Sequence, residues 1–163
     1  MANAIYPGTF DPVHNGHVDI VTRASKLFEK LCVAVYSGPS KNVIFSAKER
    51  VDLFAEAVAH LDNVQVVKFS GLAPVFAKQN GASFIVRGLR AGVDFESEFE
   101  MTLMWRSLNP EIDTVCMMSS LQYQFVYSSR IKEVAQLGGN VHDLVPKKVT
   151  EQLKTKLNSI SSG

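Results

Sequence analysis

Short apolar runs alternate with amphipathic stretches along most of this 163-residue chain. The apolar runs are only a few residues long and rich in β-branched side chains, which is typical of buried strands. We predict strands over Asn3–Tyr6, Leu31–Tyr36, Val64–Phe69, Ser83–Arg87 and Thr114–Met118. The stretches between and after them repeat apolar positions at helical spacing. We predict helices over Gly16–Lys30, Ala47–His60, Leu72–Asn80, Phe95–Leu108, Ser128–Leu137 and Pro146–Leu157.

Strands that are separated by helices need crossover connections, and these favour a parallel sheet covered on both faces. The predicted fold class is therefore α/β, a doubly wound, five-stranded parallel sheet of the Rossmann-like nucleotide-binding type. We expect one domain over residues 1–163 with a frayed Ser-Gly tail. Ligands of such sheets bind beyond the carboxyl ends of the strands. The loops after the strands should form that surface: Pro7–His17, Ser37–Ser46, Ser70–Leu72, Gly88–Asp94 and Ser119–Ser128.

Composition excludes some classes of partner. The net charge is +1 and the basic residues are spread along the chain, whereas a nucleic-acid-binding protein usually has a basic surplus. Small anionic ligands remain compatible with this balance. The first residues resemble no signal peptide, and no apolar run approaches the length of a membrane span. Cys32 and Cys116 lie in apolar runs and form no C-x-x-C pair, so we predict buried free thiols and a cytoplasmic protein.

The segment Thr9–His17 carries the strongest chemical signal. It joins a predicted strand to a predicted helix through Asn15-Gly16, and it places His17 on the first helical turn. Unpaired N–H groups and the dipole make a helix start a binding site for phosphate. His14 and His17 could instead bind a metal together with Asp11, or form a structural pair. We favour phosphate contact, which indicates chemistry on a nucleotide.

Further cationic and hydroxyl side chains lie in the loops after other strands. Lys41 is either a solvated surface lysine or an ammonium that follows a phosphate during reaction. Ser128 and Ser129 open a predicted helix, where they either cap it or hold phosphates. The preceding loop, residues 123–126, has aromatic and apolar side chains suited to an adenine ring.

Arg87 and Arg90 bracket Gly88-Leu89 just beyond an apolar run. Two guanidinium groups at the end of a strand can form a fork for an anion. The alternative is that they form ion pairs with the acidic side chains that follow, namely Asp94, Glu96 or Glu98. We favour the anion fork.

These motifs together resemble a known family. T-F-D-P-x-x-N-G-H resembles the (H/T)-x-G-H signature of nucleotidyltransferases. The chain from Ala4 to Leu153 is similar to the phosphopantetheine adenylyltransferase family of coenzyme A synthesis. The other matching segments are Pro39-Ser40-Lys41, Arg87-Gly88-Leu89-Arg90, Phe95-Glu96-Ser97-Glu98 and Tyr127-Ser128-Ser129-Arg130-Ile131-Lys132.

The resemblance implies reversible adenylyl transfer from ATP to 4′-phosphopantetheine. We expect catalysis by His17, Lys41 and Arg90. For ATP, the expected contacts are Thr9, Phe10, His17, Gly88, Leu89, Arg90, Glu98, Tyr123, Gln124, Phe125, Val126, Tyr127, Ser128 and Ser129. For the second substrate they are Thr9, Lys41, Ala73 and Arg87. The resemblance also implies Mg²⁺ bound through phosphates and water, no dedicated metal ligands, feedback binding of coenzyme A, and a homohexamer.

The chain departs from the family pattern at four positions. His14 and Ala73 stand where Thr and Leu are common, and Tyr127 and Trp105 stand where Ser and Asn are common. An apolar groove for the pantetheine arm is expected near Leu72, Ala73 and Met101–Met104. Two alternatives remain: a sibling nicotinamide-mononucleotide adenylyltransferase or cytidylyltransferase, and a nucleotide-binding sensor without turnover.

Overall fold

The centre of the molecule is a parallel sheet of five strands, in the order β3-β2-β1-β4-β5. The computed structural model describes residues 1–39, 42–90 and 92–161. The strands are β1 (Ala4–Gly8), β2 (Leu31–Tyr36), β3 (Val64–Phe69), β4 (Phe84–Leu89) and β5 (Asp113–Met118). Every neighbouring pair is parallel. The predicted fold class is confirmed.

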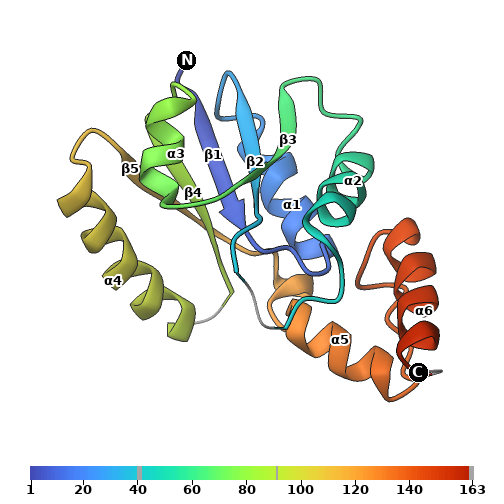
Figure 1. Cartoon of the computed structure of the whole chain (residues 1–163). Coiled ribbons are helices and arrows are strands. Elements are labelled where there is room, and N and C mark those ends of the chain that lie inside the picture. The colour runs from blue at the N-terminus through green and yellow to red at the C-terminus, as the bar shows by residue number, and fades with distance from the viewer. Residues whose placement is uncertain (40–41, 91, 162–163) are drawn as a thin grey trace.

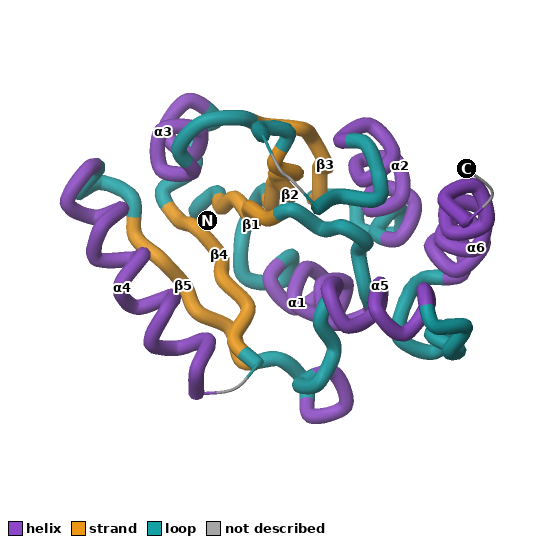
Figure 2. The backbone as a smooth tube through the Cα atoms, turned by 60° about the horizontal axis from the view of Figure 1, so that its bottom comes forward, coloured by secondary structure: helices purple, strands orange, loops and turns teal. Residues whose placement is uncertain are grey.

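Helices cover both faces of this sheet (Figures 1 and 2). Their bounds are α1 (Asn15–Ala24), α2 (Ala47–Ala57), α3 (Ala73–Gln79), α4 (Gly92–Leu108), α5 (Ser128–Gln136) and α6 (Lys147–Ser161), with a short 3₁₀ turn at Leu121–Tyr123. The larger apolar core joins one sheet face to α1, α2, α5 and α6. A smaller core joins the other face to α3, with Trp105 of α4 packed against it. The two cores bury apolar area on both faces, which is the main stabilising contribution in a fold of this kind.

Several predicted boundaries were wrong. Helix α1 ends at Ala24 although the helical spacing continues to Lys30. Beyond Ala24 the chain turns, and the side-chain amide of Asn63 donates hydrogen bonds to the carbonyls of Ser25 and Phe28. A distant residue thus satisfies carbonyl groups that helix continuation would otherwise satisfy. Helix α2 also ends three residues early, whereas α6 runs through Ser161, into the predicted tail.

The two cysteines are free, but they are not both buried. Cys116 is exposed because it lies on β5, the edge strand of the sheet. Cys32 lies on the inner strand β2 and is half-buried, and burial raises the pKa of its thiol to about 11. The prediction of buried thiols was therefore wrong for Cys116, and for Cys32 the burial is only partial. Within the described ranges, no helix has the length and apolar character that crossing a membrane requires.

Candidate active site

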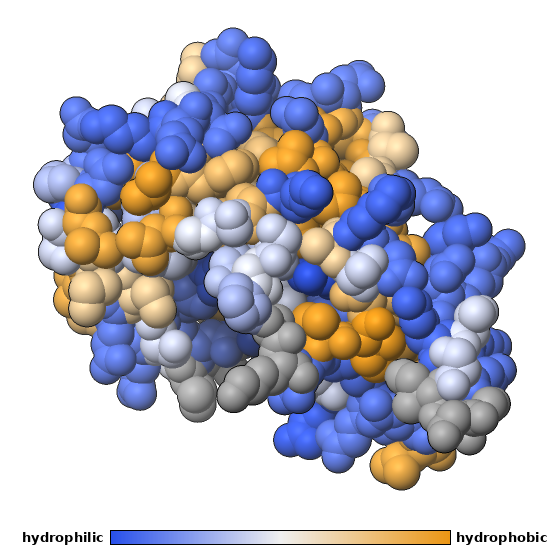
Figure 3. All heavy atoms as spheres, viewed as in Figure 1, coloured by the Kyte–Doolittle hydropathy of each residue, from blue (hydrophilic) through white to orange (hydrophobic). Residues whose placement is uncertain are grey.

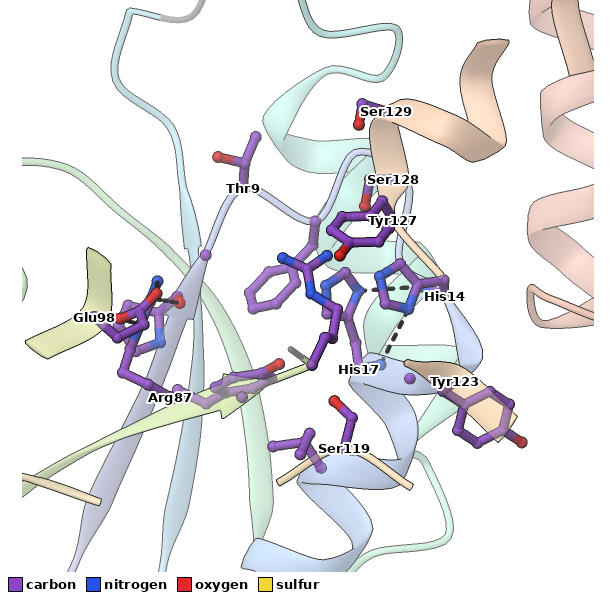
Figure 4. A pocket seen from close by; sticks show the side chains of 18 residues that line it. Thr9, His14, His17, Arg87, Glu98, Ser119, Tyr123, Tyr127, Ser128 and Ser129 are labelled. Atoms are coloured by element: carbon purple, nitrogen blue, oxygen red, sulfur yellow. Dashed lines mark hydrogen bonds and ion pairs between the residues drawn. The ribbon is translucent and has the colours of Figure 1, made fainter. Parts of the chain in front are cut away.

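A cavity of about 340 Å³ lies at the carboxyl ends of the strands, where the sequence places the site. Its walls come from the β1 loop, the start of α1, the end of β4 and the segment around residues 119–129 (Figure 4). The predicted residues that line it are Thr9, Phe10, His17, Arg87, Gly88, Arg90, Glu98, Tyr123, Tyr127, Ser128 and Ser129. Residues from four separate stretches of sequence are thus brought together.

The loop that follows β1 depends on an unusual backbone conformation at Phe10 and on a glycine at position 8. Phe10 has φ 52°, in the left-handed region that residues other than glycine rarely adopt. Its ring packs edge-on against His17 and Phe54 and is buried. A Cβ at Gly8 would lie 2.7 Å from that ring, so only glycine fits there. The strained loop therefore holds an aromatic ring against the imidazole of His17.

His14 and His17 form a reciprocal cap at the start of α1 (Figure 4). The backbone N–H of His17 donates to Nδ1 of His14, and the backbone N–H of His14 donates to Nδ1 of His17. The two rings stack with centroids 3.5 Å apart. A Cβ at Gly16 would lie 3.0 Å from the His14 ring, which explains the glycine between them.

This geometry sets the protonation of both imidazoles. Burial lowers the pKa of His14 to about 3, with a further lowering by the charge of Arg90. Burial, His14 and the two arginines hold the pKa of His17 well below its ordinary value. Both rings are therefore neutral at pH 7. Because each Nδ1 accepts a hydrogen bond, each proton lies on Nε2, which becomes a donor.

Nε2 of His14 is buried and has no hydrogen-bond partner among the described residues, and His14 lines the cavity. An unpaired buried donor is costly, so a ligand acceptor there would be stabilising. The metal alternative is not supported. Asp11 accepts hydrogen bonds from the amides of Ile44 and Phe45 and from Lys132 instead of facing the imidazoles. No set of three possible metal-binding side chains gathers within the described ranges.

Arg87 and Arg90 form ion pairs with acidic side chains of α4, which the sequence analysis gave as the alternative to an anion fork. Arg87 donates to both carboxylate oxygens of Glu98 at 2.6 Å, and it also donates to the carbonyl of Pro7. Arg90 pairs with Asp94 through Nε at 2.8 Å. Burial opposes the shift, but hydrogen bonds from Arg90 hold the pKa of Asp94 below its ordinary value. The carboxylates orient both guanidinium groups, which still line the cavity.

The start of α5 faces the same cavity. Ser128 Oγ donates to the carbonyl of Pro12, and Ser129 is exposed (Figure 4). Neither serine caps the helix, because the N-cap is Tyr127, which makes no side-chain capping bond. Within the described part of the chain, the first amides of α5 therefore have no capping side chain, as an anion site requires.

Two buried charged side chains, Asp11 and Arg50, connect the loops around the cavity through hydrogen bonds and an ion pair. Asp11 links the β1 loop to residues 44 and 45 and to Lys132 of α5. Arg50 of α2 donates to the carbonyls of Thr9, Tyr36 and Phe45. Sequence reasoning missed Arg50 and this role of Asp11. The available signal was a charged residue, Arg50, at a position that helical spacing puts on the buried face of α2.

Some predicted site residues lie elsewhere. Leu89 and Val126 are buried in the apolar interior, Phe125 is 64% exposed, and Gln124 does not line the cavity. Lys41 lies outside the described residues. The lining also includes Tyr6 of β1 and Ile20 of α1, which lie outside the loops that sequence reasoning assigned to the ligand surface. Pro7 and Ser119 lie within those loops but were not named as site residues.

Two positions that sequence reasoning singled out on α3 and α4, Ala73 and Trp105, do not line this cavity, although Glu98 of α4 does. Ala73 begins α3 and is buried in the smaller core. Trp105 is half-buried on α4, and Arg87 lies over its ring at 5.8 Å from the centroid. The side chain at position 105 thus contacts the arginine that faces the cavity.

The chain is also similar to known proteins in sequence and in fold. The cytidylyltransferase-like family model matches residues 5–134. A phosphopantetheine adenylyltransferase of Thermomicrobium roseum is 54% identical over 160 residues, which are 96% of each chain. One of Heliobacterium modesticaldum is 46% identical over all of this chain and 97% of the relative. A solved structure from Vibrio parahaemolyticus, assigned as a nicotinate-nucleotide adenylyltransferase, superposes with a TM-score of 0.69 at 16% identity. It covers 94% of this chain and 99% of that one, and it supports the fold alone.

Proposed function

The chain belongs to the phosphopantetheine adenylyltransferase family, and on that premise we propose that it transfers the adenylyl group of ATP to 4′-phosphopantetheine. An oxygen of the phosphopantetheine phosphate attacks the α-phosphorus of ATP. The bond from that phosphorus to the bridging oxygen of pyrophosphate breaks. The products are dephospho-coenzyme A and pyrophosphate, and the reaction is reversible.

The observation that carries this proposal is the set of fixed donors around one cavity. Neutral His17, two arginines and an uncapped helix start all face it. The attacking group is a phosphate with a second pKa near ~6, so it is already anionic at neutral pH. Catalysis then needs alignment of two anions and neutralisation of the charge that develops at the α-phosphorus.

Each donor has a role in this scheme. Nε2–H of His17 donates to an oxygen of the α-phosphate, and Nε2–H of His14 adds a second donor nearby. Arg90 neutralises charge on the phosphates, and Lys41 follows the transferring group. The amides and hydroxyls at Ser128 and Ser129 hold the β- and γ-phosphates, as helix starts do in other nucleotide sites.

The acceptor side is assigned to Arg87 and Thr9. Arg87 keeps N–H groups beyond the three that bond to Glu98 and Pro7, and Thr9 is exposed in the cavity wall. The pantetheine arm would lie over exposed apolar side chains of the segment Met101–Met104 on α4 and over Leu72, the N-cap of α3. In that segment the exposed apolar side chains are Met101, Leu103 and Met104. Ala73 is buried, so its contact would be through the backbone.

Mg²⁺ enters with ATP in this proposal. The cavity carboxylate Glu98 and its neighbour Asp94 are both paired with arginines, so the described residues offer no carboxylate cage. The ion would be held by phosphate oxygens and water, where it offsets phosphate charge.

We also propose a homohexamer in the cytoplasm, with coenzyme A as a competing ligand of the same cavity. Apolar side chains crowd the α3 and α4 side of the surface (Figure 3). On α4 the exposed ones are Phe95, Phe99, Met101, Leu103, Met104 and Leu108. A patch of this extent on one helix is typical of a surface that other subunits cover.

The test is an assay of the purified protein with ATP and Mg²⁺, scored by mass for the dinucleotide product. The acceptors are 4′-phosphopantetheine and nicotinamide mononucleotide, and a parallel reaction replaces ATP by CTP. Product with ATP and 4′-phosphopantetheine alone supports the proposal, and product with nicotinamide mononucleotide or CTP instead refutes it. Binding of ATP without pyrophosphate release under any acceptor would indicate the sensor alternative.

His17→Ala tests the assigned role in the same assay. We expect kcat to fall by roughly 10²–10³-fold, as when a donor to a developing charge is removed. The thermal midpoint is measured alongside, and a control variant, His60→Ala, alters an exposed histidine far from the cavity lining. Near-normal turnover of His17→Ala would remove this imidazole from the mechanism.

A further inference from the structure

Tyr127 is a poor residue for the position it holds. It is the N-cap of α5, where Ser, Thr, Asp or Asn normally accept a hydrogen bond from the first helical turn. The side chain of Tyr127 makes no such bond. Its ring is turned into the cavity instead, above the paired histidines (Figure 4). A residue that breaks a local rule in this way usually has a tertiary or functional contact that accounts for it.

That contact is with Arg90. The guanidinium carbon of Arg90 lies 3.8 Å from the centroid of the Tyr127 ring, within the distance range of cation–π stacking. The carboxylate of Asp94 binds the same guanidinium through Nε and Nη2, at 2.8 and 3.3 Å. Asp94 thus binds the N–H groups of the Arg90 guanidinium, and the ring of Tyr127 packs against its planar face.

The supported group is directed at the reacting part of the cavity. Arg90, His14 and His17 line the same cavity, and the charge of Arg90 lowers the pKa of both imidazoles. An arginine side chain has several rotatable bonds and is costly to hold in one position. A rigid aromatic ring with two rotatable bonds can supply that support before the substrate binds.

We propose that Tyr127 is a positioning residue, whose ring holds the guanidinium of Arg90 where it meets the phosphates of ATP. The inference rests on the proposed function, because Arg90 must act on ATP for its position to affect turnover. It assigns Tyr127 an indirect role, in place of direct contact with the nucleotide. It also accounts for an aromatic residue where a serine would cap α5 better.

Stacking of this kind is modest in energy. Removal of the ring should therefore lower kcat/KM for ATP by about five- to thirtyfold, which is the range for a partly desolvated cation–π contact. The Tyr127→Leu variant removes the π-system and keeps apolar bulk. The Tyr127→Phe variant keeps the ring and should recover most of the loss, because the hydroxyl is not part of the contact.

A double-mutant cycle separates positioning from direct binding. If Tyr127 acts through Arg90, Tyr127→Leu costs little further activity when it is added to Arg90→Met. In an Arg87→Met background it keeps its full effect, because Arg87 lies over Trp105 and not over Tyr127. This second cycle is the matched control. Additive losses with Arg90→Met would overturn the proposal and indicate that the ring contacts ATP itself.

Two further measurements keep the outcomes distinct. ATP affinity is measured by calorimetry without the acceptor, and the thermal midpoint is measured for every variant. Positioning predicts that Tyr127→Leu lowers kcat more than it weakens ATP binding, with the same thermal midpoint as Tyr127→Phe. A lower midpoint together with equal losses in both arginine backgrounds would indicate a structural role and refute the inference. If the wild-type protein releases no pyrophosphate with 4′-phosphopantetheine, the proposed function fails first, independently of these cycles.

Discussion

The neutral histidine at the start of α1 should make the protein sensitive to mild acid. His14 is 3% exposed, and burial lowers its pKa to about 3. In the unfolded chain the same imidazole has a pKa of about 6.5. As the pH falls below that value, the unfolded chain takes up a proton that the folded chain does not. The free energy of unfolding therefore decreases between about pH 6.5 and pH 3.

The size of the effect follows from the two pKa values. Between pH 7 and pH 5 the difference in proton uptake at His14 removes about 2 kcal/mol from the free energy of unfolding. His14→Thr should avoid this loss, because threonine does not titrate in this range. Threonine also keeps a side-chain acceptor at the N-cap, so the variant should unfold within about 1 kcal/mol of the wild type at pH 7.

Urea denaturation at pH 7 and pH 5 measures this difference. The single tryptophan, Trp105, is half-buried and provides the fluorescence signal. Carboxylates titrate in both proteins and also change the free energy of unfolding. The informative quantity is therefore the decrease in the free energy of unfolding from pH 7 to pH 5 in the wild type, minus the same decrease in the variant. His60→Thr, at an exposed position, is the control and should show the wild-type loss. Equal losses for wild type and His14→Thr would refute the assignment of a buried, neutral imidazole.

Three other predictions follow from the geometry. Asp11→Ala should reduce the free energy of unfolding by about 3–5 kcal/mol, because two amides lose their acceptor and Lys132 loses its carboxylate partner, keeping the carbonyl of Asn42. Lys132→Met should reduce the free energy of unfolding by less, because Asp11 keeps its amide donors, and equal reductions would contradict this view. Phe99→Glu on the exposed face of α4 should reduce the mass measured by light scattering, whereas Leu27→Glu, at an exposed apolar position outside that face, should not. Chelation of Mg²⁺ should abolish adenylyl transfer and leave the thermal midpoint unchanged, and a lower midpoint would reveal a metal bound by the protein itself.

The fold was accessible to sequence reasoning because its signals are local. Apolar runs of strand length, separated by helical spacing, allow few arrangements other than a doubly wound parallel sheet. The exact ends of the helices could not be predicted from such local signals. Helix α1 ends at Ala24 because Asn63, nearly forty residues away, bonds to the carbonyls beyond it. Contacts of that kind leave no trace in the hydrophobic pattern.

The site residues also fall into those that local sequence signals predict and those that depend on tertiary contacts. The position of His17, Arg87 and Arg90 at the cavity could be predicted, because each lies near the carboxyl end of a strand or the start of a helix, where ligands of this fold bind. The roles of Arg50 and Asp11 could not, because they depend on which loops lie side by side in space. Cys116 was misplaced for a related reason: an apolar run does not say whether its strand is central or at the edge.

For Arg87 and Arg90, the sequence allowed two interpretations, a fork for an anion or ion pairs with the acidic side chains that follow. The structure shows why the two are compatible. A guanidinium has five N–H donors, and a bidentate carboxylate occupies two of them. Arg87 uses a third on the carbonyl of Pro7 and still lines the cavity. An ion pair with Glu98 therefore fixes the direction of the group without consuming its capacity for an anion. In Glu98→Gln the guanidinium would lose that charged support, so acceptor binding should weaken even though a negative charge has been removed from the site. Tighter binding of 4′-phosphopantetheine to Glu98→Gln would show instead that the carboxylate competes with the substrate.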